Sequence, residues 1–365
     1  MKILMIARTT LFSTPGGDTV QITKTAEYLN KIKGVRVDVK IVGDTIDFRK
    51  YHFLHFFNIT RPSDIIGIIK ESKLPYVISP IYINFSEAEA NHYVKSRRFL
   101  NKFFNTDQIE YIKILTRVLK GQEKLTDFRY IFNGQRKSIK KIIRGTKLLL
   151  PNSKSEYTRL HKRYGIKQKY TIIPNAIDID IFSGDTENDK YDKFANSVIC
   201  VGQITPVKNQ LKLIHALNNT KYKVYIIGNP SPNAISYYNK CKKGATNNII
   251  FIPFMEQKEL AKIYKKAKVH VLASWFETTG LVSLEAAFCG CNIVITDRGD
   301  QKEYFKNDAY YCEPNNPNSI FNAVEKAFES NRNSRLKKRI HSNFTWEITA
   351  HKTFEAYKET FPHLN

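Results

Sequence analysis

Two glutamates, Glu277 and Glu285, stand eight positions apart in the stretch WFETTGLVSLEAA, residues 275–287. Glu285 lies at the edge of an apolar helical face that begins at Leu281, and burying a carboxylate is costly unless it is hydrogen-bonded. A vicinal diol, such as the 2′ and 3′ hydroxyls of a ribose, would satisfy both carboxylate oxygens. The alternative is that both glutamates are surface residues that interact favourably with the helix dipole.

The helix that carries Glu285 is expected to begin at Gly280, directly after the loop that holds Glu277. The first N–H groups of a helix have no partner within it, and they attract anions such as phosphates. Glu277 would then face whatever lies beyond the phosphates. The residues expected to bind a phosphorylated ligand around this helix start are Thr279, Gly280, Leu281 and Val282.

Two further loops could contact phosphates. The loop VGQITPVKNQ, residues 201–210, places Lys208 after a predicted strand, where a cation can meet a phosphate. The loop RTTLFSTPGGDTVQ, residues 8–21, carries Gly16 and Gly17 just before a helix expected from about Asp18. Paired glycines let the backbone approach a ligand closely. A solvated lysine and a bare turn with a capped helix remain the simpler alternatives.

Short apolar runs alternate with amphipathic stretches along the chain, which predicts parallel sheets covered by helices on both faces. The second half shows this pattern more regularly than the first. The predicted strands are residues 2–7, 36–42, 53–57, 76–79, 147–150, 197–203, 222–228, 248–254, 268–274 and 291–297.

Two such sheets in tandem predict an α/β chain with two doubly wound domains, whose ligands bind beyond the carboxyl ends of the strands. We expect a first domain over 1–185, a second over 186–343 and a final amphipathic helix within 344–365. The polar segment 175–196 is expected to be the linker between the domains.

The overall composition is that of a globular protein, with 365 residues, 42% hydrophobic and 25% charged. The apolar run in MKILMIARTT is too short for a signal peptide, and no stretch approaches the ~18 apolar residues of a membrane span. We therefore expect a cytoplasmic protein. Its five cysteines lack metal-ligand spacing, and the acidic pair Asp178 and Asp180 falls in the expected linker, so no metal site is predicted.

The formal net charge is +24, and residues 95–147 supply +11 of it, from fifteen Lys and Arg against four acids. The stretches RRFLNKFF (97–104) and YIKILTRVLK (111–120) mix cations with large apolar residues. Basic amphipathic helices of this kind lie in the interface of anionic membranes. Core-packing helices with a solvated basic face are the alternative.

Together these motifs resemble the retaining, nucleotide-sugar-dependent glycosyltransferases of family 4. The resemblance rests on the spacing of the two glutamates, the VGQITPVKN loop, PNAID at 174–178, the PGGDT loop and the terminal FTWE helix. It implies the GT-B architecture: two Rossmann-like domains, an acceptor-binding N-terminal one and a donor-binding C-terminal one, with a cleft between them. It also implies that the terminal helix returns to the first domain.

The resemblance also implies roles for individual residues. Glu285 would hold the ribose and Glu277 the hydroxyls of the donor sugar, while Lys208 would neutralise the diphosphate as it leaves. Phe254 would border the base, and Gly16 and Gly17 would approach the phosphates from the first domain. Such enzymes need no dedicated nucleophile, because the departing diphosphate itself accepts the proton of the acceptor. No cofactor is implied besides the donor substrate.

Three departures from the family pattern stand out. Gln203 replaces the usual Arg, so the diphosphate would lose one cation, for which Arg298 is a candidate substitute. Ala176 replaces a glycine, which predicts only a small structural change. The His that the family often places near the reaction centre is missing from YVISPIYINF, residues 76–85, and Tyr82 or His92 could contribute on the acceptor side instead. For each of the two, a packing or surface role is the alternative.

We therefore predict a retaining glycosyltransferase that moves a sugar from a UDP- or GDP-sugar to a glycan or lipid-linked acceptor in cell-surface polysaccharide synthesis. The expected location is the cytoplasm. If the basic segment 95–147 binds lipid, we expect the protein at the inner face of the cell membrane. The alternatives are a GT-B sugar-nucleotide epimerase, which needs no acceptor, and a basic nucleic-acid-binding protein. The chain shows no aromatic-basic recognition module of the kind that nucleic-acid binding would predict.

Overall fold

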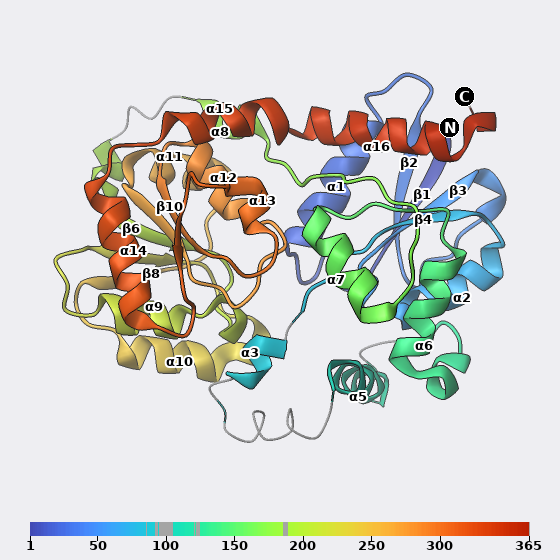
Figure 1. Ribbon diagram of the computed structural model, residues 1–365, viewed down its shortest axis with the longest axis horizontal. Helices are drawn as coiled ribbons and strands as arrows, with labels where there is room; N and C mark the ends of the chain where they lie inside the picture. The colour runs from blue at the N-terminus through green and yellow to red at the C-terminus, as the bar shows by residue number, and fades with distance from the viewer. Residues whose placement is uncertain are drawn as a thin grey trace. The chain divides into compact units, whose positions relative to one another are not determined.

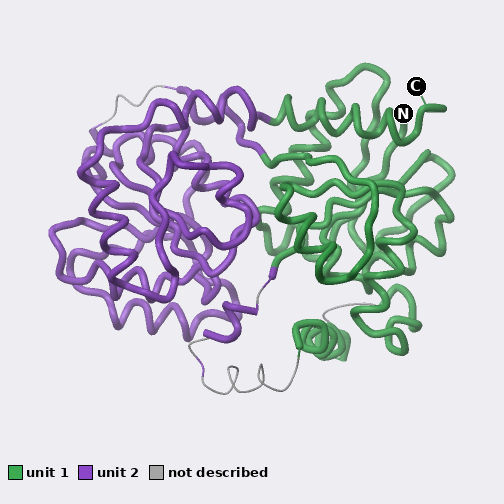
Figure 2. Tube along the Cα trace, in the orientation of Figure 1, with its two compact units in different colours: residues 1–83, 99–175, 346–365 green, residues 84–98, 176–345 purple. Residues whose placement is uncertain are grey.

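The computed structural model describes residues 1–84, 86–91, 94, 105–119, 121, 125–184 and 189–364. The chain divides into two compact units, which are coloured separately in Figure 2. Unit 1 contains residues 1–83, 99–175 and 346–365, and unit 2 contains residues 84–98 and 176–345. The division therefore falls after Asn175, before the boundary expected at residue 185.

Unit 1 is built on a five-stranded parallel sheet with the order β2-β1-β3-β4-β5. Its strands are β1 (Lys2–Ala7), β2 (Arg36–Ile41), β3 (Phe53–Phe57), β4 (Tyr76–Ser79) and β5 (Leu148–Leu149). The central strands β1, β3 and β4 are buried almost throughout, because helices cover both faces of a parallel sheet. All five strands confirm the predictions for the first half of the chain.

The helices of unit 1 come from the first half of the sequence and from its C-terminal end (Figure 1). They are α1 (Gly17–Leu29), α2 (Pro62–Ser72), α5 (Thr106–Leu119), α6 (Arg129–Gly145), α7 (Lys154–Tyr164) and α16 (Trp346–Thr360), with the 3-10 turns η1 (Phe48–Lys50) and η5 (Pro362–Leu364). The α16 helix packs beside α1, and Phe53 of β3 stacks on Phe361 with ring centroids 4.4 Å apart. The last helix of the sequence thus completes the core that the first strands begin.

Unit 2 has a six-stranded parallel sheet with the order β11-β10-β9-β6-β7-β8. Its strands are β6 (Val198–Val201), β7 (Val224–Ile227), β8 (Ile249–Ile252), β9 (Val269–Leu272), β10 (Asn292–Thr296) and β11 (Tyr310–Cys312). Five of them confirm the predicted strands. The prediction missed β11, an edge strand of three residues, two of which are only partly buried, so it lacks the apolar run that marks the others.

Successive residues of the central strands in unit 2 point to opposite faces of the sheet and pack into two separate apolar cores. Val198 and Cys200 of β6 pack on one face of the sheet, and Ile199 and Val201 pack on the other. The helices of unit 2 are α3 (Ser86–Ala90), α8 (Ile179–Ser183), α9 (Gln210–Leu217), α10 (Ile235–Gly244), α11 (Gln257–Lys266), α12 (Leu281–Phe288), α13 (Gln301–Phe305), α14 (Pro317–Glu329) and α15 (Ser334–Asn343). The 3-10 turns are η2 (Asp189–Phe194), η3 (Pro206–Lys208) and η4 (Pro232–Ala234).

The expectation that residues 175–196 form a polar linker is wrong. Phe182 of α8 and Tyr191 and Phe194 of η2 are at most 2% exposed and belong to the core of unit 2. The sequence misleads here because single large apolar residues stand between polar ones, and one-residue anchors do not produce a periodic pattern. The described residues of this segment after Asn175 therefore belong to unit 2.

None of the helices in the described ranges combines the length and apolar composition that crossing a membrane requires. All five cysteines are free thiols, and only Cys289 is partly exposed.

Candidate functional site

The loop between β9 and α12 carries the two glutamates singled out in the sequence. Gly280 adopts φ 74°, which lets the chain turn sharply into α12, and the helix begins one residue later, at Leu281. Glu277 is 8% exposed and Glu285 is 5% exposed. The alternative reading, in which both are surface glutamates, is therefore wrong.

Lys208 and Glu277 form an ion pair, with Lys208 Nζ 2.5 Å from Glu277 Oε1. Lys208 ends the η3 turn after β6, and β6 lies next to β9 in the sheet, so the two loops leave the same sheet edge. The pair is largely withdrawn from water, because the side chains of Lys208 and Glu277 are 27% and 9% exposed. The sequence predicted both residues as site residues without predicting their contact.

Asn209 ties the Lys208 loop to its neighbours. Its amide Nδ2 donates hydrogen bonds to the carbonyls of Ala273, at 2.9 Å, and Pro314, at 2.7 Å, and its backbone adopts φ 61°. The N–H of Trp275 also donates to the carbonyl of Val207, at 2.9 Å. These bonds fix the backbone on both sides of the ion pair, so that Lys208 is held in place by its loop.

The loop after β10 supports Glu277 from the other side. The N–H of Asp300 donates to the carbonyl of Glu277 at 3.0 Å, and Gly299 forms a single β-bridge with Glu277. Gly299 has φ 86°, and a Cβ there would lie 1.9 Å from the Glu277 carbonyl oxygen. Only glycine allows this close approach of two backbones.

Glu285 accepts a hydrogen bond from a neighbouring helix. Gln257, the first residue of α11, donates from Nε2 to Glu285 Oε1 at 2.9 Å. Burial raises the pKa of Glu285 to about 7, and the hydrogen bond from Gln257 opposes that rise. A buried carboxylate with a pKa of about 7 is partly ionised at neutral pH, and it can accept further hydrogen bonds from the hydroxyls of a ligand.

The N-terminus of α12 points its first amides out of the helix. Its first intrahelical hydrogen bonds run from the N–H groups of Ser283 and Leu284 to the carbonyl of Gly280. The N–H groups of Leu281 and Val282 precede these bonds, as expected for a helix start that binds an anion. Thr279 is buried, whereas Leu281 and Val282 are partly exposed.

The other residues predicted for the second domain also follow strands of the same sheet. Gln203 follows β6 with an exposed side chain, and its carbonyl accepts a hydrogen bond from Gln210 Nε2 at 3.1 Å. Phe254 follows β8, is 63% exposed, and donates its N–H to Asn229 Oδ1 at 3.1 Å. A binding role for either remains a prediction.

Arg298 is not the free cation that the sequence suggested. Its guanidinium contacts three carboxylates, those of Asp297 at 2.5 Å and of Glu87 and Glu313 at 2.8 Å each. These acids raise the pKa of Arg298 above its usual range. Because its charge is already compensated, Arg298 is a poor substitute for the arginine that Gln203 replaces.

Two candidates for the acceptor side have different outcomes. Tyr82 is 8% exposed, belongs to the core of unit 1 and packs edge-on against Tyr164 at 6.0 Å, which favours the packing alternative. His92 lies outside the described residues, as does the stretch 97–104.

Gly16 and Gly17 lie in unit 1, at the start of α1, where Gly16 is the N-cap residue with an extended backbone. The loop before them is braced by Arg8, whose Nε lies 2.7 Å from Asp18 Oδ2. Arg8 also donates to the carbonyl of Thr14 at 2.8 Å. The role of the two glycines at the phosphates remains a prediction.

Sequence reasoning missed Asn209, Gln257 and Gly299, which position the predicted site residues. Asn209 and Gly299 each lie next to a residue already considered, Lys208 and Arg298, in a strand-to-helix loop, and that position was the available signal. The sequence gave no signal for Gln257, because Gln257 and Glu285 are 28 positions apart and lie on different helices.

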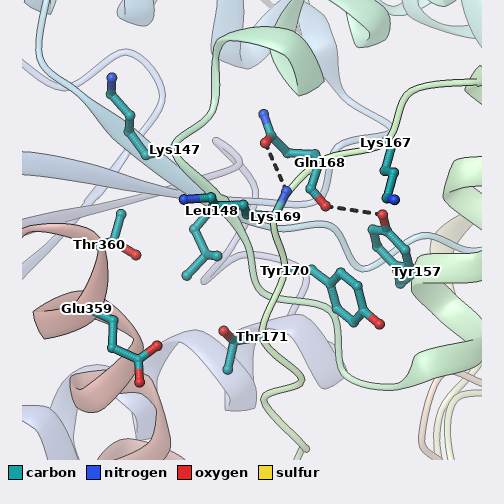
Figure 3. A pocket seen from close by; sticks show the side chains of 10 residues that line it. All are labelled: Lys147, Leu148, Tyr157, Lys167, Gln168, Lys169, Tyr170, Thr171, Glu359 and Thr360. Carbon is teal, nitrogen blue, oxygen red and sulfur yellow. Dashed lines mark hydrogen bonds between the residues drawn. The ribbon is translucent and has the colours of Figure 1, made fainter.

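A separate cavity of about 740 Å³ lies in unit 1 (Figure 3). It is lined by Lys147, Leu148, Tyr157, Lys167, Gln168, Lys169, Tyr170, Thr171, Glu359 and Thr360. Tyr157 stacks on Tyr170 at 3.7 Å and donates its hydroxyl to the carbonyl of Gln168 at 3.1 Å. These lining residues include none that the sequence predicted for the site.

Comparison with known proteins shows that part of the chain is similar to a known family. Residues 185–343 match the sequence profile of the family described as "Glycosyl transferases group 1". A glycosyltransferase of Methanocaldococcus jannaschii, described as uncharacterised, is 27% identical over 172 residues, which are 44% of this chain and 44% of that protein. The chain thus matches less than half the length of this relative.

Solved structures are similar over nearly the whole chain. Sucrose-phosphate synthase from Thermosynechococcus elongatus superposes with a TM-score of 0.76 at 14% identity, covering 99% of both chains. HepE of Anabaena, in complex with UDP-glucose, superposes with a TM-score of 0.72 at 13% identity, covering 98% of this chain and 100% of that one. The fold is therefore GT-B, with two Rossmann-like domains. Residues 185–343 are thus similar in sequence to the group 1 glycosyltransferases.

Proposed function

We propose that this protein is a retaining glycosyltransferase that moves a sugar from a UDP- or GDP-sugar to a glycan or lipid-linked acceptor. The observation that carries the proposal is the Lys208–Glu277 ion pair next to the start of α12, with the buried Glu285 about one turn further along the same helix. The match of residues 185–343 to group 1 glycosyltransferases supports it, as does the UDP-glucose complex of the structurally similar HepE.

In this proposal each group has a separate electrostatic task. Glu285 accepts hydrogen bonds from the ribose hydroxyls, and the amides of Leu281 and Val282 receive the diphosphate. Lys208 neutralises the charge that develops on the diphosphate as the sugar leaves, which lowers the barrier without a dedicated nucleophile. Glu277 orients Lys208 and contacts hydroxyls of the donor sugar, and assignment to family 4 would fit these roles.

We further propose that the acceptor is met at the cytoplasmic face of a membrane, in the synthesis of a cell-surface polysaccharide. The support is the positive charge, +24 for the chain, of which residues 95–147 supply +11. Anionic lipids attract such segments electrostatically.

Two substitutions in the full chain test the site. Glu285→Ala should weaken binding of the nucleotide sugar by about 10- to 100-fold, because a charged hydrogen-bond acceptor is lost. Lys208→Ala should instead lower kcat by about 100- to 1,000-fold while affecting donor affinity less. Calorimetric titration with UDP- and GDP-sugars and a transfer assay measure the two effects.

A panel of nucleotide sugars should first identify the donor by its effect on the melting temperature, since a ligand of the folded state alone raises it. If Glu285→Ala and Lys208→Ala both kept wild-type binding and turnover, the site assignment would be wrong. Turnover of the donor to an isomer without any acceptor would favour an epimerase.

A further inference from the structure

The exposed apolar side chains of the protein are concentrated on two neighbouring elements of unit 1. Nine large apolar side chains are exposed in the described part of the chain, and five of them lie within residues 112–132. We call these five the apolar tip: Ile112 (46% exposed), Leu119 (88%), Phe128 (75%), Ile131 (40%) and Phe132 (86%). Such a concentration indicates an interaction surface, because single exposed apolar residues are normally scattered.

The backbone that carries the apolar tip is held in place by contacts of α5 and α6. Tyr130 lies between two tip residues in the sequence, yet it is fully buried, and its ring lies 5.5 Å from that of Tyr111 on α5. The Tyr111 hydroxyl donates to the carbonyl of Ile131 at 2.8 Å, which joins α5 to the first turn of α6. At the other end of α5, Asp107 accepts a hydrogen bond from Arg163 at 2.8 Å. The exposed side chains therefore project from anchored backbone.

The backbone at Gly134 separates the first turn of α6 from the rest of the helix, since its φ of 63° and ψ of −177° are not helical. Phe128 and Phe132 are four positions apart within that turn, so they project on the same side. After the break, α6 returns to ordinary packing, with Ile139, Ile142 and Ile143 in the core of unit 1.

Exposed cations follow the tip along α6. The described residues between 105 and 144 contain eight Lys and Arg against three acids. Among those on α6, the exposed ones are Arg129, Arg136, Lys137, Lys141 and Arg144. Large apolar side chains next to exposed cations are the composition of interfacial membrane anchors, in which the apolar groups enter the lipid and the cations stay with its headgroups.

We propose that the apolar tip docks unit 1 on an anionic lipid bilayer, with Phe128 and Phe132 inserted among the lipids and the cations of α6 held at the headgroups. Charge favours this partner over a second copy of the chain, because dimerisation through the tip would bring two cationic surfaces together. The proposal deepens the proposed function by giving its membrane partner a docking surface, and it can be tested without transfer activity.

The experiment compares the full chain with Phe128→Ser/Phe132→Ser in co-sedimentation with two kinds of vesicle. One kind is phosphatidylcholine alone, and the other also contains phosphatidylglycerol. Wild type should bind the anionic vesicles and leave the neutral ones largely unbound. The double variant should bind them about tenfold more weakly for each phenylalanine lost. Lys137→Gln/Lys141→Gln should lose about fivefold per cation.

A matched control is Ile172→Ser/Ile235→Ser, which removes exposed isoleucines outside the tip and should bind vesicles like wild type. All variants should keep the wild-type far-UV circular dichroism and the thermal stabilisation by a nucleotide sugar, which separates this test from that of the donor site. Equal vesicle binding by wild type and the tip variant would overturn the proposal. Failure of wild type to bind anionic vesicles would also overturn it. The same holds if the tip variant lost only self-association, or only oligonucleotide binding, while its vesicle binding stayed unchanged.

Discussion

Two buried carboxylates near α12 are stabilised in different ways. Glu277 is neutralised by the ammonium of Lys208, at 2.5 Å. Glu285 accepts a hydrogen bond from the neutral amide of Gln257, at 2.9 Å, and burial raises its pKa to about 7. A buried charge that is compensated by hydrogen bonds alone costs folding free energy. Under the proposed function, this cost is retained because the carboxylate binds the two ribose hydroxyls of the donor.

This difference predicts a pH dependence of stability. The folded pKa of Glu285, about 7, lies above its ordinary value of 4.5, so between these values the folded protein holds a proton that the unfolded chain has lost. The free energy of unfolding should therefore fall as the pH rises from about 5 to 8, by up to about 3 kcal/mol from this group. Glu285→Gln should remove that part of the decrease, as measured by urea unfolding at both pH values.

The difference between wild type and Glu285→Gln isolates this carboxylate, because the other titrating groups are shared. A constant difference across the range would mean that Glu285 is ionised at all these pH values. Since a charged carboxylate is the better acceptor for hydroxyl groups, the affinity of wild type for its nucleotide sugar should also rise through pH 7.

At the scale of elements, three adjacent strands bring the site loops together. The order β10-β9-β6 places the loops that hold Gly299, Glu277 and Lys208 at one edge of the sheet. Each loop is bonded to its neighbour through backbone or amide groups, so the ion pair is positioned by the sheet as a whole. Glycine at 299 is essential to this arrangement, because the two backbones nearly touch.

Gly299→Ala should therefore disturb the site more than an ordinary glycine substitution. Gly43 also has a positive φ, of 102°, but a Cβ there meets nothing within 4 Å, so Gly43→Ala is the matched control for backbone strain. Gly43→Ala should cost about 1–2 kcal/mol of stability. Gly299→Ala should cost more and also lower kcat. Equal losses of stability, with unchanged turnover, would show that the contact with Glu277 is unimportant.

At the scale of the molecule, the two units have separate cores, and unit 1 is completed by the end of the chain. Tyr357 of α16 is fully buried, donates or accepts a hydrogen bond with His55 Nδ1 at 2.7 Å, and packs edge-on against Phe53 at 5.0 Å. Burial lowers the pKa of His55 to about 3, so this histidine stays neutral under ordinary conditions. Stability of unit 1 thus depends on residues more than 300 positions from its first strands.

Tyr357→Ala should destabilise unit 1 selectively, by about 3–5 kcal/mol, because it leaves a cavity and an unpaired imidazole nitrogen. Hydrogen exchange should show lost protection in β1 and β3 with little change in β6 and β9. Tyr222→Ala, at an equally buried position in unit 2, should give the opposite result. Loss of protection in both units with either variant would mean that the chain unfolds as one cooperative body.

The sequence by itself determined the strands and the helix that carries Glu285. Continuous apolar runs such as KILMIA are long enough to mark a strand buried on both faces, and glycine before an amphipathic run marks a helix start. These are local signals, set by backbone sterics and by the burial of neighbouring side chains. The three-residue β11 and the anchors Phe182 and Tyr191 escaped prediction because they are too short or too isolated to form a pattern.

Only the tertiary structure decided which side chains meet. Lys208 and Glu277 are 69 positions apart, and Gln257 and Glu285 are 28 apart, so their contacts depend on strand order and helix packing. Arg298 was a plausible free cation until the fold placed three carboxylates around it. Charge compensation and pKa depend on distances between groups that are remote in the chain, and a linear sequence does not contain those distances.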